Sequence, residues 1–188
     1  AAAGWQVTMV EFLSPGINIK GYNIIASRDF GQPKILLGAH YDSRMGANNE
    51  QDPAKKDLPV PGANDGASGV AVLLEIGRTL DPSITNVDLV FFDQEDQGEI
   101  NGWNWILGSQ AYVEKMDETP KELILLDMVG AENSHFRYEM TSTDSLKQQI
   151  WAVAQEKGYG DIFVAQNGYS ILDDHTPFLK KGIPAVDI

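Results

Sequence analysis

One short stretch of sequence indicates how this chain is built: residues 35–42 read Ile-Leu-Leu-Gly-Ala-His-Tyr-Asp. An apolar run that ends in histidine and aspartate is typical of a buried strand followed by residues that carry chemistry. Residues 87–96, Val-Asp-Leu-Val-Phe-Phe-Asp-Gln-Glu-Asp, repeat this arrangement, and the run Leu123–Leu126 ends in Asp127. The carboxyl ends of parallel strands meet at one edge of a sheet, so these polar residues are expected to lie close together.

The other segments predict the fold class. Further strands are expected at Tyr22–Ala26, Ile162–Ala165 and Ile183–Ile188. Helices are expected at Ser68–Leu80, at Thr143–Lys157, and over a short segment with Thr176 as N-cap, Pro177 as first helical residue and Gly182 as its stop. Alternating strands and helices favour an α/β fold, a three-layer α/β/α sandwich with a mixed, mostly parallel central sheet. The loops 42–64 and 94–104 are long and polar, which is typical of functional loops.

Composition excludes several classes of protein. The chain has 188 residues, of which 43% are hydrophobic, so a single globular domain over residues 1–188 is expected. Fourteen Lys and Arg against 27 Asp and Glu give a formal charge of −13, which argues against nucleic-acid binding. The sequence contains no apolar run long enough to cross a bilayer. It also contains no cysteine, so any metal must be held by histidine and carboxylates.

The strand-end carboxylates predict a cation site. Carboxylates that lie together repel, and some would have to protonate unless a cation neutralises them. Asp65 stands in the glycine-rich segment 62–69, at the start of a predicted helix. The helix dipole stabilises a carboxylate at this place, which could serve either as a metal ligand or as a plain helix cap. Glu95 and Asp96 are adjacent, so one can bind metal while the other acts as general base, although most acidic pairs in loops are surface residues. One histidine with several carboxylates suits zinc, and manganese or cobalt would also fit.

Five motifs resemble those of the co-catalytic zinc exopeptidases of the aminopeptidase type and of the related glutaminyl-peptide cyclotransferases. They are Gly38–Ser43, Gly62–Gly69, Phe91–Asp96, Leu125–Gly130 and Asp173–Phe178. These motifs run in the family's order and span most of the chain. The resemblance implies the zinc exopeptidase, or phosphorylase/hydrolase-like, version of the α/β sandwich.

The resemblance also implies the metal ligands. Asp65 would be a ligand, and Asp96 takes the place of a ligating glutamate, as in bacterial cyclotransferase-like members. The family's last ligand is a histidine beyond the strand that ends here at Ile188, so the chain is interpreted as a segment truncated at both ends, beginning partway through a first helix. His175 is a candidate substitute ligand, but its expected role is a structural hydrogen bond. His135 is expected to be a surface residue.

Catalytic roles follow from the same resemblance. Glu95 would be the general acid/base. In members with two metals, His40 and Asp127 would hold a second ion bridged by Asp65. In cyclotransferases, Asp127 and Asp173 would instead share protons with Glu95. Trp103 and Trp105 could form an aromatic wall for the substrate side chain, and Trp103 is the preferred candidate. Alternatively, both side chains could simply cover the sheet.

The segment Asp173–Phe178 resembles cyclotransferases more than aminopeptidases. The leading prediction is therefore a zinc-dependent glutaminyl-peptide cyclotransferase, which converts an amino-terminal glutamine of a peptide to pyroglutamate and releases ammonia. It would hold one zinc ion. The alternatives are an aminopeptidase with one or two metals and a non-catalytic binding module. Relatives of this type imply a monomer exported from the cell or to the bacterial envelope, acting on peptide amino termini.

Overall fold

The computed structural model describes residues 4–14, 17–29 and 34–188. Within these residues, the main sheet has the strand order β1-β2-β4-β3-β5-β8. Its strands are β1 (Gln6–Leu13), β2 (Lys20–Ser27), β3 (Ile35–His40), β4 (Val87–Phe92), β5 (Glu122–Leu125) and β8 (Ala185–Asp187). β3 is parallel to β4 and to β5, β5 is parallel to β8, and β2 runs antiparallel to β1 and β4. The predicted mixed sheet with a parallel centre is confirmed.

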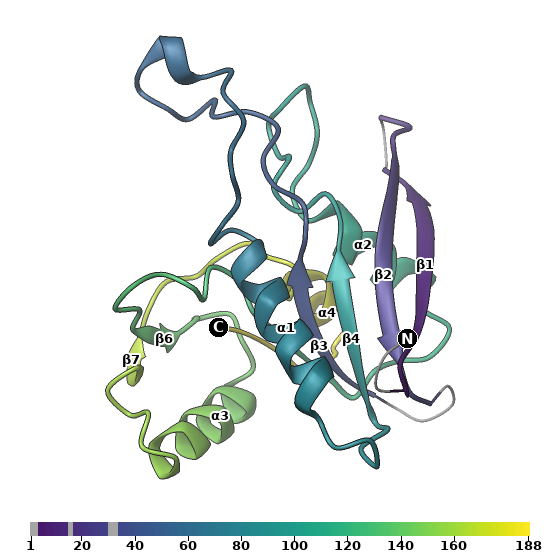
Figure 1. Cartoon of the computed structure of the whole chain (residues 1–188), viewed down its shortest axis with the longest axis vertical. Coiled ribbons are helices and arrows are strands. Elements are labelled where there is room, and N and C mark those ends of the chain that lie inside the picture. The colour runs from purple at the N-terminus through teal and green to yellow at the C-terminus, as the bar shows by residue number, and fades with distance from the viewer. Residues whose placement is uncertain (1–3, 15–16, 30–33) are drawn as a thin grey trace.

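Helices cover both faces of this sheet. α1 (Ala67–Thr79) lies on one face, while α2 (Leu107–Lys115) and α4 (Thr176–Lys180) lie on the other (Figure 1). The predicted three-layer sandwich is therefore confirmed. Beside β8 lies a smaller unit, made of α3 (Asp144–Glu156) and a two-stranded sheet of β6 (Phe136–Tyr138) and β7 (Phe163–Asn167). In the described part of the chain, no helix is both long enough and apolar enough to cross a membrane.

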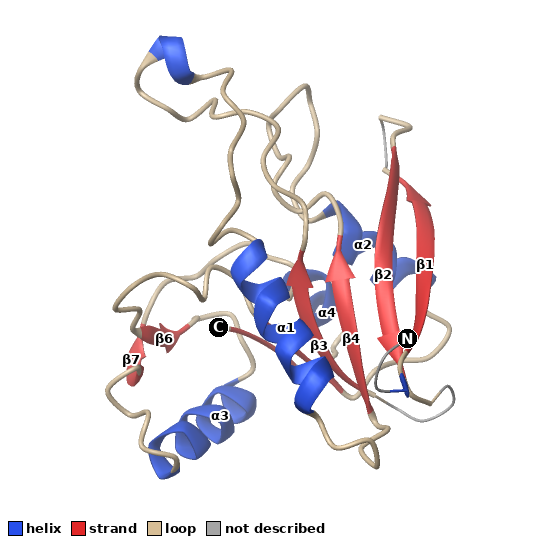
Figure 2. Ribbon diagram, in the orientation of Figure 1, coloured by secondary structure: helices blue, strands red, loops and turns tan. Residues whose placement is uncertain are grey.

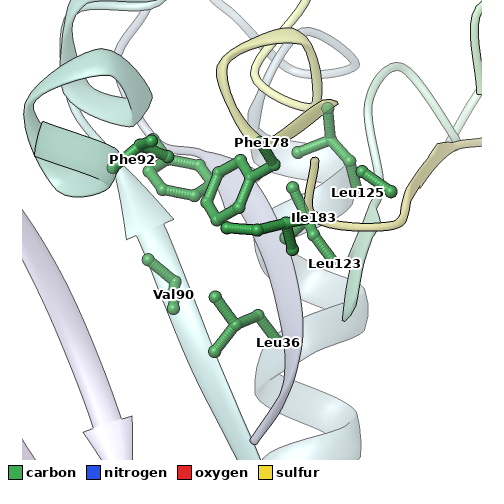
Figure 3. Packing of buried hydrophobic residues seen from close by; sticks show 9 residues of the cluster. Leu36, Val90, Phe92, Leu123, Leu125, Phe178 and Ile183 are labelled. Atoms are coloured by element: carbon green, nitrogen blue, oxygen red, sulfur yellow. The ribbon is translucent and has the colours of Figure 1, made fainter. Parts of the chain in front are cut away.

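The core lies in two layers, one on each face of the sheet. Val90 and Phe92 of β4 point toward α2 and α4, and the ring of Phe92 meets Phe178 with centroids 6.1 Å apart (Figure 3). Leu89 and Phe91 point the other way and pack with Leu73 of α1. Because both faces are covered, this strand can be apolar at successive positions.

Two loops extend beyond the carboxyl ends of the parallel strands, as Figure 2 shows. The first connects β3 to α1 and carries the short 3-10 helix η2 (Pro53–Lys55) near its tip. The second connects β4 to α2. The long loops predicted at 42–64 and 94–104 are these two segments.

Most predicted elements are present, with a few differences. α3 lies within the predicted range, and α1 begins one residue before the predicted Ser68. α4 begins at Thr176 rather than at Pro177, so His175 rather than Thr176 is its N-cap. The run Ile162–Ala165 contributes to β7, but this strand pairs with β6 outside the main sheet. Neither β1 nor α2 was predicted. The expectation that the chain begins within a helix concerns residues 1–3, which lie outside the described residues.

Candidate functional site

The site begins with His40, the last residue of β3. Its ring is buried, and Nε2 lies 2.9 Å from Oδ1 of Asp65 and 3.2 Å from Oδ1 of Asp127. On the other side of the ring, Nδ1 lies 3.4 Å from Oδ1 of Asp42. Ligand atoms of His40, Asp65 and Asp127 all lie within 4.8 Å of one another. Residues from the ends of two strands and from the start of α1 thus converge on one point.

Glycines allow this convergence because they let α1 approach the sheet. A Cβ atom at Gly66 would lie 2.7 Å from Nε2 of His40, so only glycine leaves room for the ring. At Gly69, a Cβ atom would overlap the carbonyl oxygen of Leu126, just beyond β5. The close approach of α1 to both strands places Asp65 against His40.

This donor set fits a divalent metal. Burial by itself would lower the pKa of His40, but the surrounding carboxylates of Asp127, Asp42 and Asp65 raise it far above its usual range. The site therefore favours a positive charge between the carboxylates, which either a proton or a metal ion supplies. One imidazole nitrogen with carboxylate oxygens is a ligand set that zinc accepts, and Asp42 at Nδ1 would orient the ring.

Asp42 also organises the loop that follows β4. Its Oδ1 accepts the backbone N–H of Glu95 at 3.0 Å, and its Oδ2 accepts that of Asp96 at 3.3 Å. The side-chain amide of Gln97 donates to the same Oδ2 at 2.8 Å. One carboxylate beside β3 therefore fixes the two acidic residues beyond β4.

Asp96 lies outside the cluster formed by His40, Asp65 and Asp127. Burial and the negative charge of Asp65 raise the pKa of Asp96 to about 6, while the positive charge of Arg44 opposes this shift. Arg44 Nη1 lies 3.3 Å from Oδ1 of Asp96. Asp65 therefore belongs to the His40 cluster and also acts on Asp96 through its charge.

Glu95 is in an environment that favours its protonated form. Burial is the largest cause, and the charges of Asp174, Asp127 and Asp96 add to it, although His40 opposes them. Together they raise the pKa of Glu95 to about 9. A carboxyl group with this environment can hold a proton and pass it on, as a general acid/base must.

Three more aspartates lie buried behind these residues. Burial and neighbouring carboxylates raise the pKa of Asp173 well above its usual range, and its side chain lies within hydrogen-bonding reach of Asp127. Burial likewise raises the pKa of Asp174 to about 7 and that of Asp187 to about 8. Neither carboxylate oxygen of Asp174 has a hydrogen-bond partner among the residues that the structure describes.

No role is predicted from the sequence for Asp42 or Asp174, although both stand in the quoted motifs, and neither Arg44 nor Asp187 is singled out there. Asp187 could have been found, because it is the last residue of β8 and follows an apolar run, as His40 follows the run of β3. Asp42 and Arg44 act through loop contacts that no spacing in the sequence indicates.

The aromatic and histidine candidates have partners of their own. Trp103 packs beside Phe12 and Leu107 under the edge of the sheet, which favours its role as cover. Nε2 of His175 lies 2.8 Å from the hydroxyl of Thr141, a contact of the structural kind expected for this residue. His135 is exposed. The geometry brings together His40, Asp65, Glu95, Asp96, Asp127 and Asp173, whereas Trp103 and His175 pack elsewhere and His135 is on the surface.

Comparison with known proteins gives a consistent picture. The sequence profile of peptidase family M28 matches residues 23–188. The crystal structure of a glutaminyl cyclase from Bacteroides thetaiotaomicron, bound to N-acetylhistamine, superposes with a TM-score of 0.90 at 34% identity. That alignment covers 100% of this chain and 71% of the cyclase chain.

Two curated relatives represent the two activities. A glutaminyl-peptide cyclotransferase-like protein from Bos taurus is 25% identical over 224 residues, covering 100% of this chain and 56% of the relative. Aminopeptidase YwaD from Bacillus subtilis is 33% identical over 168 residues, covering 81% of this chain and 31% of the relative. The chain thus spans little more than half of the length of the first relative and about a third of the second.

Proposed function

Because the chain belongs to peptidase family M28, we propose that the protein is a zinc-dependent glutaminyl-peptide cyclotransferase. Its substrate would be a peptide or protein with an amino-terminal glutamine, and its products would be the same chain with an amino-terminal pyroglutamate, and ammonia. The observation that supports this choice is the position of Asp173 within hydrogen-bonding reach of Asp127, in a group of buried carboxyl groups that also raises the pKa of Glu95. Such a group can move a proton, which ring closure requires.

Asp65 and Asp96 would be ligands of the zinc ion. The chemistry that zinc supplies when bound is polarisation of the γ-carbonyl of the glutamine. Arg44 and Asp42 fix Asp96 from both sides, so its carboxylate would be held in place before the substrate arrives. The acidic surroundings would also attract a positively charged amino terminus.

Glu95 would carry the proton. The neutral α-amine nitrogen attacks the γ-carbonyl carbon, the new C–N bond closes the ring, and Glu95 in its ionised form takes one proton from that nitrogen. Glu95 then gives this proton to the side-chain amide nitrogen as the old C–N bond breaks, so ammonia leaves. Both reacting groups belong to one residue, so holding the side chain folded back would supply much of the acceleration.

An ammonia-release assay on the full-length protein tests this proposal. We expect ammonia from a peptide that begins with glutamine, and none from the same peptide with an acetylated amino terminus. Glu95→Gln should lower kcat by about a hundredfold or more, because it removes the proton carrier. Glu99→Gln, an exposed residue of the same loop, is the matched control and should leave kcat unchanged. Ammonia at the level of the blank would rule the proposal out.

A second candidate is aminopeptidase action. The clustering of ligand atoms of His40, Asp65 and Asp127 within 4.8 Å favours it, since these residues could hold a second metal ion. Glu95 would then take a proton from the water that attacks the first peptide bond. Metal analysis separates the two: one zinc ion per chain favours cyclisation and two favour hydrolysis. Release of a free amino acid from a leucine-initiated peptide would support the second candidate.

Three further expectations belong to this proposal. The protein would be exported, to the bacterial envelope or beyond, and it would act as a monomer. Trp103, which is partly buried beside Phe12, would form a wall for the substrate side chain. Cell fractionation and light scattering of the full-length protein would check the first two.

A further inference from the structure

Arg44 is a buried arginine whose guanidinium nitrogens all have partners. It follows Asp42 by two residues in the loop after β3, and 8% of its surface is exposed. Nε donates to the side-chain oxygen of Asn48 at 2.8 Å, and Nη2 donates to the carbonyl oxygen of Gly98 at 3.0 Å. Nη1 donates to two atoms of Asp96, the backbone carbonyl at 2.7 Å and Oδ1 at 3.3 Å. The guanidinium thus connects the loop after β3 to the loop after β4.

An aromatic ring fixes the plane of this guanidinium. The Cζ atom of Arg44 lies 4.8 Å from the ring centroid of Trp105, a cation–π arrangement. Trp105 in turn lies directly on the backbone of Gly98, where a Cβ atom would overlap its ring. With the ring on one side and carbonyl oxygens at its edge, the guanidinium has one orientation open to it.

These contacts restrict Asp96 in particular. Its N–H is bound by Asp42 and its carbonyl oxygen by Arg44, so the backbone of this residue is held from both sides. The bond from Arg44 to Oδ1 engages one carboxylate oxygen and leaves Oδ2 as the atom open to another partner. An aspartate is one methylene shorter than glutamate, so its reach depends strongly on where its backbone lies.

We propose that Arg44 is a positioning residue for the metal ligand Asp96: it binds Oδ1 and the backbone carbonyl, and thereby presents Oδ2 to zinc. This inference depends on the ligand role that the proposed function gives to Asp96, but not on the reaction that follows. Partners of metal-binding carboxylates typically change metal affinity by about 10- to 100-fold when they are removed.

Zinc affinity of the full-length protein is the direct test. Competition with a chromophoric chelator would measure the zinc Kd of the wild type, Arg44→Met and Arg44→Lys. We expect Arg44→Met to raise the Kd by about 10- to 100-fold. Arg44→Lys should recover part of this loss, because one ammonium group can reach Asp96 but cannot replace the planar fork between Asp96 and Gly98. The visible spectrum of the cobalt-substituted protein should change in Arg44→Met, since it reports the ligand geometry.

Arg28 offers a matched control within the same chain. Its guanidinium lies 4.2 Å from the ring centroid of Trp5 and donates to the carbonyl oxygens of Leu80 and Asp81, at 3.1 and 2.7 Å. Like Arg44, it lies over a tryptophan ring and binds backbone carbonyls, but it is less buried and makes no contact with a proposed ligand. We expect Arg28→Met to change stability and to leave both the zinc Kd and the cobalt spectrum as in the wild type.

Three results would overturn the inference. The first is a folded Arg44→Met protein with the zinc Kd and cobalt spectrum of the wild type. The second is an equal loss of zinc affinity in Arg28→Met, and the third is failure of both Arg44 variants to fold, which would make Arg44 a general structural residue.

Asp96→Ala separates this inference from the ligand assignment. If this variant binds zinc as the wild type does, Asp96 is not a ligand, and both the ligand assignment and the inference fail. Weaker zinc binding in Arg44→Met without ammonia release would support the inference while the proposed reaction fails.

Discussion

At the scale of single residues, Glu139 shows how one buried carboxylate can hold several segments together. It accepts the backbone N–H groups of Thr141, Ser142 and Ile171, and it lies 3.3 Å from Nε2 of His175. Burial would raise its pKa, but these donors outweigh burial and lower the pKa of Glu139 to about 2. The loop before α3, the loop before α4 and the N-cap of α4 are thus tied to one side chain.

A pH dependence of stability follows from this shift. The folded-state pKa lies below the unfolded value, so the ionised carboxylate stabilises the protein above about pH 4.5, and this contribution is lost as the pH falls toward 2. We expect the urea unfolding free energy of the wild type to fall between pH 5 and 2 by on the order of 3 kcal/mol more than that of Glu139→Gln. Glu132→Gln, at an exposed position, should keep the steep wild-type dependence. Parallel curves for the wild type and Glu139→Gln would contradict this account.

At the scale of elements, the contact of α1 with the sheet decides whether Asp65 reaches His40. Gly69 and Gly77 lie on the buried side of this helix. A Cβ atom at Gly69 would overlap the backbone carbonyl of Leu126, whereas one at Gly77 would lie 3.0 Å from a terminal methyl of Leu89, which can move. The two positions therefore differ in what an added methyl group would meet, not in their helical context.

This difference gives a matched pair of variants. Alanine favours a helix interior over glycine by about 1 kcal/mol, so Gly77→Ala should be close to neutral in urea unfolding. Gly69→Ala should destabilise the protein by about 1–3 kcal/mol, because the helix must move away from β5. It should also weaken zinc binding, since Asp65 moves with the helix. Equal stabilities for the two variants would show that the contact at Gly69 does not hold α1 in place.

Some elements could be predicted from the sequence because their own pattern specifies them. α1 has an apolar stripe, and β4 is apolar on both faces, so period and length identified them. α2 was missed because its first turn is buried on all sides and it begins after Ile106 in a left-handed conformation, so no amphipathic stripe marks it. β7 was misplaced because its residues pack on Trp151 of α3 rather than in the main sheet.

The candidate site could likewise be predicted only in part from the sequence. Strand ends brought His40, Glu95 and Asp127 to one edge, since parallel strands fix that edge whatever the loops do. The contacts of Asp42 and Arg44 with the loop after β4 depend on backbone conformations such as the positive φ of Gln94, which is 57°. No local sequence rule requires that conformation in a glutamine, so these contacts could be found only in three dimensions.

At the scale of the whole molecule, a net charge of −13 and a cluster of buried carboxyl groups make stability sensitive to bound cations. Zinc that binds only the folded protein stabilises it by about 2.7 kcal/mol when its free concentration is a hundred times its Kd. We expect a chelator to lower the melting temperature of the full-length protein, and added zinc to restore it in a concentration-dependent way. In Asp65→Ala, this response to zinc should be lost or strongly reduced. A melting temperature that ignores the chelator would contradict a zinc site.

The order of strands in the main sheet also has a kinetic consequence. Leu37 pairs with Leu89 and with Ile124, so the strand ends that carry the acidic residues meet only when segments far apart along the chain have come together. Such non-local pairing makes folding slow, because long loops must close before the contacts form. Asp65 and Asp96 stand in loops beyond these strands, so we expect them to take their final positions only after the strands have paired. Zinc that binds only the folded protein would therefore slow its unfolding and leave its rate of folding nearly unchanged.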